Sequence, residues 1–376
     1  MRSSPEIAFL FIGGEHHVAH LAPVAAAISL KRRDICVTCY CADVRTHAAL
    51  DAVARAMGAG KMRVVRMSPP RASGLLARLM HRASAAKGPM LAKIRWMVRD
   101  AVAIVAPERT SAALRWMGWR RPLIHVRHGA GDRVLKSEAR LTAFDLVLVA
   151  AQKYVDRVVA LGVDRAKVRA VGYVKLDYLR HVPVPDQPLF DNDRPVVVYN
   201  PHFDGSVSSL GIAKEVIARF AGQDRYNLVF APHVRAFEDA DADERVAWEA
   251  LAVPGKVRID LGSPMLFNMA YMRAGDLYLG DVSSQLYEFL VEPRPAVFLN
   301  PHGVDWAQDP AYIGWKLGEV AGGADDVLDA VDRAIAREPE RARAQARAMA
   351  DAFGDYEGAI GRAADAIIEQ LFPVAR

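Results

Sequence analysis

The chain has few cysteines, and none of them suggests a metal or disulfide framework. Its three cysteines are Cys36, Cys39 and Cys41, all within the strand-like segment DICVTCYC. A structural zinc site needs a second pair of ligands at a recognisable spacing, and the sequence holds no further cysteine. We therefore expect reduced, packed thiols, as in proteins of the cytoplasm.

Long hydrophobic runs are also missing. The longest early apolar run, Ile7 to Ile12, is far too short for a signal peptide or a membrane-spanning helix. Low-complexity tracts and internal repeats are absent as well. We expect a cytoplasmic protein whose contact with a membrane, if any, is peripheral and on its inner face.

Acidic residues are missing from one long block. Residues 52–99 contain eleven Lys or Arg and no Asp or Glu, within a net charge of +5. Such a block indicates an acidic partner. Between Arg71 and Arg99 the basic residues flank apolar ones, which predicts helices lying on an anionic membrane surface. The alternative is a surface helical hairpin whose apolar face packs on the domain core. Nucleic acid is not expected, because the sequence shows neither an RNA-binding aromatic signature nor a helix-turn-helix pattern.

The length, composition and periodicity of the sequence predict two α/β domains. The chain has 376 residues, of which 52% are apolar and 25% charged, enough for two cores. Apolar strand-like segments alternate with helical periodicity, which predicts two doubly wound parallel sheets. We place the domains at 1–182 and 183–376, divided by the proline- and Asp/Asn-rich segment 181–195, with a C-terminal helix crossing back. The predicted strands are 6–12, 34–40, 62–67, 122–126, 145–150, 168–171, 195–199, 227–231, 257–260, 276–279 and 296–299, the last closing the second sheet. The predicted helices include 16–31, 44–57, 152–161, 265–273, 283–290 and a helical tail over 337–372.

One strand-to-helix turn of the second half has the composition of an anion site. Asp281, Ser283 and Ser284 lie between the strand 276–279 and the helix 283–290. Free N–H groups and the positive end of the helix dipole attract anions at such a turn. Glu288, about one turn later, is placed to take ribose hydroxyls. The alternative is a simple helix cap, since Asp and Ser are the usual capping residues.

Two other strand ends of the second half carry polar residues. Asn200 and His202 follow the strand 195–199, and His233 follows the strand 227–231. The carboxyl ends of parallel strands share one edge of a sheet, where ligands bind. We therefore expect these residues to lie near Ser283 and Ser284.

The first half offers a second group of candidates. Gly14, His16 and His17 follow the first strand, so they are expected on the acceptor side of a site. The alternative is a purely structural pair of histidines. His16 and His20 have the spacing of metal ligands on a helix, but no third ligand is evident, so we expect no metal.

A further histidine follows the strand 122–126. His128 is succeeded by Gly129 and Gly131, which let a ligand approach the backbone, and by Arg133. An imidazole at such a position can accept a proton from an attacking hydroxyl. The alternative is a structural histidine in a turn.

These segments together resemble the CDP-glycerol glycerophosphotransferases of teichoic-acid-type polymer synthesis. The family's Trp-His-Gly-Thr-Pro is similar to residues 127–131, its Gly-Tyr-Pro-Arg-Asn-Asp to 172–177, and its strand ending in Ala-Pro-Thr to 197–202. Its Arg-x-His-Pro resembles residues 231–233, and its Thr-Asp-Tyr-Ser-Ser-x-x-Phe-Asp-Phe resembles 280–289. The matches keep their order from about residue 122 to 300.

The resemblance implies a GT-B fold, in which two Rossmann-like domains face a central cleft, and a transfer reaction. A CDP-activated alcohol such as CDP-glycerol is the implied donor, and CMP is the leaving group. The implied catalytic residues are His128 and His233, and the implied donor-binding residues are Gly129, Asn200, His202, Asp281, Ser283, Ser284 and Glu288. The acceptor is a lipid-linked molecule or a glycan, bound near Gly14, His16, His17 and Arg133, and no cofactor is expected.

Three other functions remain open from the sequence. They are a GT-B glycosyltransferase that uses a nucleotide sugar, an enzyme similar to the UDP-sugar 2-epimerases, and a non-catalytic protein that binds anionic lipid.

Overall fold

A computed structural model of the chain describes residues 4–68, 87–129, 131, 136–182 and 188–373. By its internal contacts the chain divides into two compact units. The first comprises residues 1–128, 135–182 and 353–376, and the second comprises 129–134 and 183–352. The sequence-based boundary at 182/183 coincides with one edge of this division. The sequence-based second domain, 183–376, differs from it because residues 353–376 group with the first unit.

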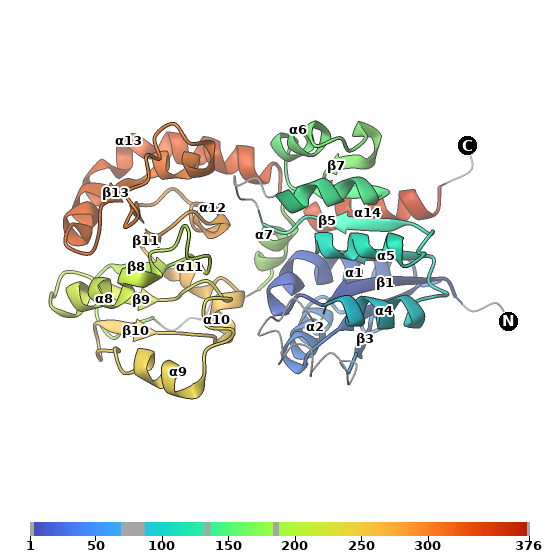
Figure 1. Ribbon diagram of the computed structural model, residues 1–376, viewed down its shortest axis with the longest axis horizontal. Helices are drawn as coiled ribbons and strands as arrows, with labels where there is room; N and C mark the ends of the chain where they lie inside the picture. The colour runs from blue at the N-terminus through green and yellow to red at the C-terminus, as the bar shows by residue number, and fades with distance from the viewer. Residues whose placement is uncertain (1–3, 69–86, 130, 132–135, 183–187, 374–376) are drawn as a thin grey trace. The chain divides into compact units, whose positions relative to one another are not determined.

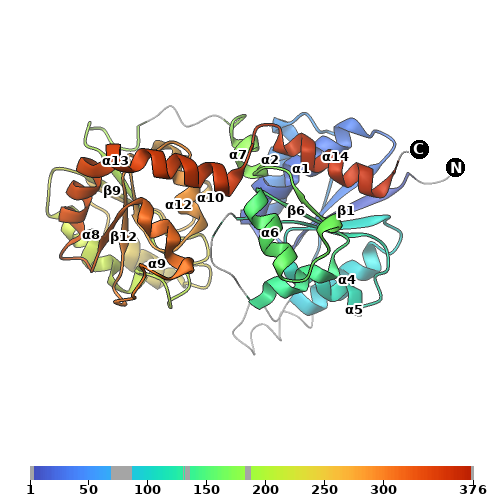
Figure 2. The same cartoon turned by 90° about the horizontal axis from the view of Figure 1, so that it is seen from above.

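The first unit contains a seven-stranded parallel sheet in the order β3-β2-β1-β4-β5-β6-β7. Its strands are β1 (Glu6–Phe11), β2 (Cys36–Cys41), β3 (Arg63–Arg66), β4 (Ala103–Ala106), β5 (Leu123–Val126), β6 (Leu146–Val149) and β7 (Val168–Ala170). Its helices include α1 (Val18–Lys31), α2 (Val44–Ala56), α4 (Lys87–Met97), α5 (Ala113–Trp116), α6 (Gln152–Ala160), α7 (Val174–Leu179) and α14 (Ala359–Leu371). Figures 1 and 2 show that α1, α2 and α14 lie on one side of this sheet and α4 and α5 on the other.

The second unit contains a six-stranded parallel sheet in the order β10-β9-β8-β11-β12-β13. Its strands are β8 (Val196–Asn200), β9 (Asn227–Phe230), β10 (Val257–Ile259), β11 (Leu277–Gly280), β12 (Ala296–Leu299) and β13 (Glu319–Ala321). Its helices include α8 (Ala213–Ala221), α9 (Ala242–Glu249), α10 (Pro264–Phe267), α11 (Ala270–Ala274), α12 (Ser284–Phe289) and α13 (Val327–Phe353), whose last residue, Phe353, belongs to the first unit. Each sheet changes winding direction once, between β1 and β4 and between β8 and β11. The predicted doubly wound, Rossmann-like architecture is therefore confirmed in both units.

Four sequence-based assignments were wrong in detail. β4 was not predicted, and β12 does not close the second sheet because β13 pairs with it in parallel. The helix predicted over 265–273 is interrupted, because Met269 takes a left-handed conformation with φ of 60° between α10 and α11. The predicted tail helix is two helices, separated by Gly354 and Gly358, which both have positive φ.

The cores explain why these segments are strands. All of β4, β5, β6, β9 and β12 is buried, as expected for parallel strands covered on both faces. In the second unit, Phe230 of β9 stacks on Trp248 of α9 with ring centroids 5.3 Å apart. Residues of α8 and α13 complete the same core.

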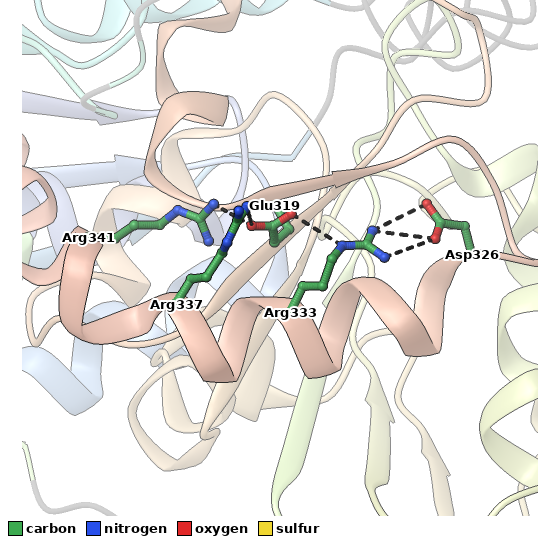
Figure 3. Close-up of polar contacts among 5 residues, drawn as sticks. All are labelled: Glu319, Asp326, Arg333, Arg337 and Arg341. Carbon is green, nitrogen blue, oxygen red and sulfur yellow. Dashed lines mark hydrogen bonds and ion pairs between the residues drawn. The ribbon is translucent and has the colours of Figure 1, made fainter.

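Helix α13 is also held to the edge strand β13 by charge. Glu319 accepts from Arg333, Arg337 and Arg341, which lie four residues apart along one face of α13, and Arg333 also contacts Asp326 (Figure 3). Nearby arginines lower the pKa of Glu319 although its burial opposes this. Three guanidinium groups on one carboxylate make a fixed ion-pair network rather than an open anion site.

The C-terminal residues complete the first unit. α14 packs on α1 and α7 (Figure 2). The buried carboxylate of Asp177 accepts from the backbone N–H groups of Gly358 (3.1 Å) and Ile360 (2.9 Å). The ring of Tyr173 stacks on that of Phe353 at 4.6 Å. The segment 172–177 thus anchors the end of the chain.

The surroundings of Gly172 show how closely the C-terminal residues pack on the first unit. Its φ is +89°, and a Cβ there would overlap Asp355 O and lie 2.9 Å from the Cβ of Ala359. Gly162 has a similar φ of +91° but nothing within 4 Å of such a Cβ. We expect Gly162→Ala to lower the free energy of unfolding by about 1–2 kcal/mol, from backbone strain alone. We expect Gly172→Ala to lower it by at least about 3 kcal/mol, because overlap adds to that strain. Urea unfolding of both variants measures the difference, and equal losses would contradict the packing described.

Candidate functional site

The centre of the second unit's site is a buried carboxylate at its winding reversal. Asp281 follows β11, next to β8, and is fully buried. Its Oδ2 accepts from the backbone N–H groups of His202 at 2.7 Å and Ser209 at 2.9 Å. Residues 202–209 form part of the loop after β8. Asp281 therefore fixes that loop at the edge where ligands bind in doubly wound sheets.

Burial makes this carboxylate unusual. Removal from water raises the pKa of Asp281 to about 6, although hydrogen bonds from Ser209 and His202 act in the opposite direction. Few donors thus stabilise the charged form at neutral pH. Because these donors lie in the loop after β8, small changes in that loop alter the free energy of burying the charge.

Two imidazoles stand side by side at the ends of β8 and β9. The ring centroids of His202 and His233 are 5.4 Å apart. Nδ1 of His202 accepts from the N–H of Asp204 at 3.0 Å, and Nδ1 of His233 accepts from the N–H of Arg235 at 3.2 Å. With Nδ1 as an acceptor, each neutral ring carries its proton on Nε2. Both histidines are therefore hydrogen-bond donors through Nε2, suited to phosphate oxygens.

An aromatic ring and a cation adjoin this pair. Phe203 stacks on His202 with centroids 4.5 Å apart and lies 4.7 Å from the His233 ring. The guanidinium carbon of Arg235 is 4.1 Å from the Phe203 centroid. The group combines donors, a planar surface and positive charge, the features that a nucleotide requires.

The remaining candidates of this edge have structural partners. Asn200 is buried, and its Nδ2 donates to Ala231 O at 2.6 Å, so its amide ties the end of β8 to the segment carrying His233. Ser283 Oγ accepts from the N–H of Gln285 at 3.1 Å and caps α12, as the alternative interpretation predicted. Glu288 is buried in α12. His302, which follows β12, donates from Nε2 to Ser208 O in the loop after β8 at 3.0 Å.

Gly129 and Gly131 pack on the start of α12. A Cβ at Gly129, whose φ is +75°, would lie 3.5 Å from Ser284 Oγ, and one at Gly131 would lie 3.7 Å from Ser284 Cβ. Both distances are ordinary van der Waals contacts, so the positive φ of Gly129 is the physical reason for glycine at that position.

The first unit has its own polar edge at the ends of β1, β4 and β5. His128 Nδ1 lies 2.7 Å from Pro107 O, which can only accept, so this nitrogen carries the proton. In the neutral ring the lone pair is then on Nε2. His128 thus has the opposite tautomer from His202 and His233, and it is the one suited to accept a proton.

Three more histidines surround His128. Its ring centroid is 4.3 Å from that of His17, 6.3 Å from His16 and 6.2 Å from His20. Burial, with help from Lys175, His128 and His16, lowers the pKa of His20 well below its usual value, so His20 is neutral at physiological pH. Gly14 begins the 3-10 helix 15–17 with φ of 108°. Among the residues that the structure describes, no three His, Cys, Asp or Glu side chains form a metal-binding group. Arg133 lies outside the described residues.

Glu108 belongs to this edge and was missed. It follows β4 and is buried, and a Cβ on Gly13 would overlap its carboxylate and lie 2.5 Å from His17 Cε1. A signal was available in the sequence. Ala106-Pro107-Glu108 repeats the pattern of Ala231-Pro232-His233, with an apolar strand followed by proline and a polar residue.

Comparison with known proteins identifies the fold but no sequence family. Neither a protein-family model nor a curated protein sequence matches the chain. Among solved structures, UDP-GlcNAc 2-epimerase from Neisseria meningitidis bound to UDP-GlcNAc is similar with a TM-score of 0.66 and 12% identity, over 98% of this chain and all of that one. MnaA of S. aureus with UDP has a TM-score of 0.63 and 12% identity, over 99% and 98%. A variant of the wall teichoic acid polymerase TagF soaked with CDPG has 0.62 and 14%, over 99% and 89%. The chain therefore has the GT-B type of fold, as the sequence predicted.

The buried carboxylate gives a pH prediction. Asp281 has a pKa of about 6 in the folded protein against an ordinary value of 3.8, so the folded state binds this proton more tightly. Its protonated form adds stability that is fully present below pH 4 and lost as the pH rises through about 6. We expect the difference in unfolding free energy between wild type and Asp281→Asn to fall by on the order of 3 kcal/mol over this window.

Urea unfolding at several pH values measures that difference. The control is Asp276→Asn, which removes an exposed carboxylate that accepts from Val196 N–H at 2.8 Å across the same two strands. The control is expected to keep the wild-type pH dependence. A pH-independent difference between wild type and Asp281→Asn would show that the carboxylate is not desolvated.

Proposed function

We propose that the protein is a transferase that moves an alcohol phosphate, such as glycerol phosphate, from a CDP-activated donor to an acceptor hydroxyl and releases CMP. The observation that carries the proposal is that its histidines have opposite tautomers in the neutral form. His128 has its lone pair on Nε2, whereas His202 and His233 carry a proton there. Transfer to a hydroxyl needs one base and several donors, and these three side chains supply both.

On the donor side, the proposal assigns the diphosphate to the edge of the second sheet. His202 and His233 donate through Nε2 to its oxygens, and Asp281 keeps His202 in place through its backbone N–H. Ser284 and Gly129 lie beside this edge, and their small size admits a phosphate. We propose that Glu288 contacts the ribose, as the family resemblance implies.

On the acceptor side, His128 takes the proton of the attacking hydroxyl. The oxygen of that hydroxyl forms a bond to the phosphorus that bears the alcohol, and the bond from this phosphorus to the CMP oxygen breaks. Fixed donors stabilise the charge that develops, which is the main task in phosphoryl transfer. The transfer as proposed uses no cofactor. His16, His17 and Gly14 line the acceptor side, and we propose a lipid-linked molecule or a glycan as acceptor.

A second candidate is a nucleotide-sugar enzyme, either a glycosyltransferase or a UDP-sugar 2-epimerase. Glu108 favours it, because this buried carboxylate lies beside His17 and the phosphate transfer does not use it. Two solved structures with similar folds contain UDP-GlcNAc or UDP. Incubation with UDP-GlcNAc in deuterated water discriminates the epimerase from the proposed transferase. An epimerase exchanges the proton at C2, whereas the proposed transferase leaves UDP-GlcNAc unchanged.

The histidines can be tested by paired substitutions. With CDP-glycerol and a membrane extract, we expect His128→Ala to lower the rate of CMP release about 10²–10⁴-fold. His233→Ala removes a donor and should lower it about 10²–10³-fold. Glutamine separates the roles, because its amide donates but accepts no proton. His233→Gln should therefore recover part of the rate, and His128→Gln none.

His47→Ala is the matched control, since His47 lies on α2 and pairs with Asp51 at 3.2 Å. It should keep the wild-type rate. Wild-type rates in both alanine variants would refute the assignment, and recovery by His128→Gln would remove the base from the mechanism.

A further inference from the structure

Two tryptophans of the first unit are exposed to an extent that folding alone does not explain. Trp96 in α4 is 69% exposed and Trp116 in α5 is 84% exposed. By contrast, three other apolar residues of α4 are buried in the core: Met90, Leu91 and Ile94. The alternative of a helix packed on the domain therefore holds for these three residues, while the rest of the segment 71–99 before Lys87 lies outside the described residues.

The two tryptophans belong to one surface. Arg95 of α4 donates to Gly118 O, just after α5, at 3.4 Å, and Arg121 donates to Arg99 O at 3.1 Å. Both figures show α4 and α5 side by side (Figures 1 and 2). We call the exposed residues Trp96, Arg99, Trp116, Met117, Arg120 and Arg121 the α4–α5 surface.

This surface is positively charged as well as apolar. The guanidinium of Arg99 lies 5.1 Å from the Trp96 ring centroid. Asp100, the one exposed acid in the described span 87–121, pairs with Arg99 at 3.5 Å, and Glu108 is buried. The α4–α5 surface holds three arginines, Arg99, Arg120 and Arg121, against this one acid, so its charge is positive.

We propose that the α4–α5 surface docks on a lipid bilayer that contains anionic headgroups. Tryptophan is enriched where a membrane meets water, because its ring is apolar and its N–H is polar. Arginines beside it attract anionic lipids, each adding to the affinity within a Debye length of the surface. None of the described helices combines the length and hydropathy needed to cross a bilayer, so the docking is peripheral. This inference deepens the proposed function by locating its membrane partner, but its test needs no catalytic activity.

The test is sedimentation of the full chain with vesicles. We use phosphatidylcholine alone and phosphatidylcholine with about a third phosphatidylglycerol. Wild type should bind the second and not the first, and added salt should weaken binding. Trp96→Ser with Trp116→Ser should lower the partition coefficient on the order of tenfold or more. Arg99→Gln with Arg120→Gln should lower the partition coefficient on the anionic vesicles.

The matched control is Val246→Ser, which removes a 63% exposed apolar side chain on α9 of the second unit and should bind like wild type. Brominated lipid should quench tryptophan fluorescence in wild type and less in the double tryptophan variant, while circular dichroism reports that the variant is folded. Failure of wild type to bind, or wild-type binding by a folded double tryptophan variant, would overturn the proposal. Concentration-dependent dimerisation that the double variant loses, without vesicle binding, would instead assign the surface to a second copy of the chain.

Discussion

The buried carboxylate of Asp281 is the constraint on which the second unit's site depends. It lies where the sheet reverses its winding, between β8 and β11, and accepts from the backbone of the loop after β8. A carboxylate without water needs donors, and here the donors belong to the loop that carries His202. The hydrogen bonds from this loop to Asp281 thus hold both the fold of the second unit and the residues of its site. The position of His202 follows from the charge of a residue about eighty positions later in the chain.

Hydrogen bonds with the backbone indicate the neutral tautomer of three histidines, His128, His202 and His233. Two imidazoles accept from a backbone N–H two residues ahead, and one donates to a carbonyl from another strand end. In the neutral rings this gives two Nε2 donors and one Nε2 proton acceptor. Proline precedes both donors, at Pro201 and Pro232, and Pro201 O also accepts from His233 N–H, which ties the two turns together.

Much of this architecture followed from periodicity, and the misses have physical causes. Residues 7–11 of β1 and 146–149 of β6 are fully apolar runs, so these strands were visible in the sequence. β4 and β13 were not predicted. Two of the four residues of β4 are alanine and β13 is Glu-Val-Ala, so both are poor in the residues typical of strands. Their pairing with β1, β5 and β12 defines them as strands. The polar strand ends were predictable from parallel topology. Hydrogen-bond partners were not, since Asn200 and Ser283 have common structural uses that only the folded chain distinguishes.

The arrangement of the C-terminus has a consequence for biosynthesis. Asp177 caps α14 and Tyr173 stacks on Phe353, so the first unit includes residues that are made after the second unit. A ribosome delivers the whole second unit before it delivers these partners. The face of the first unit that contacts α14 therefore stays uncovered until α14 has been synthesised. A truncated product that stops at residue 352 would present that face permanently to chaperones and proteases.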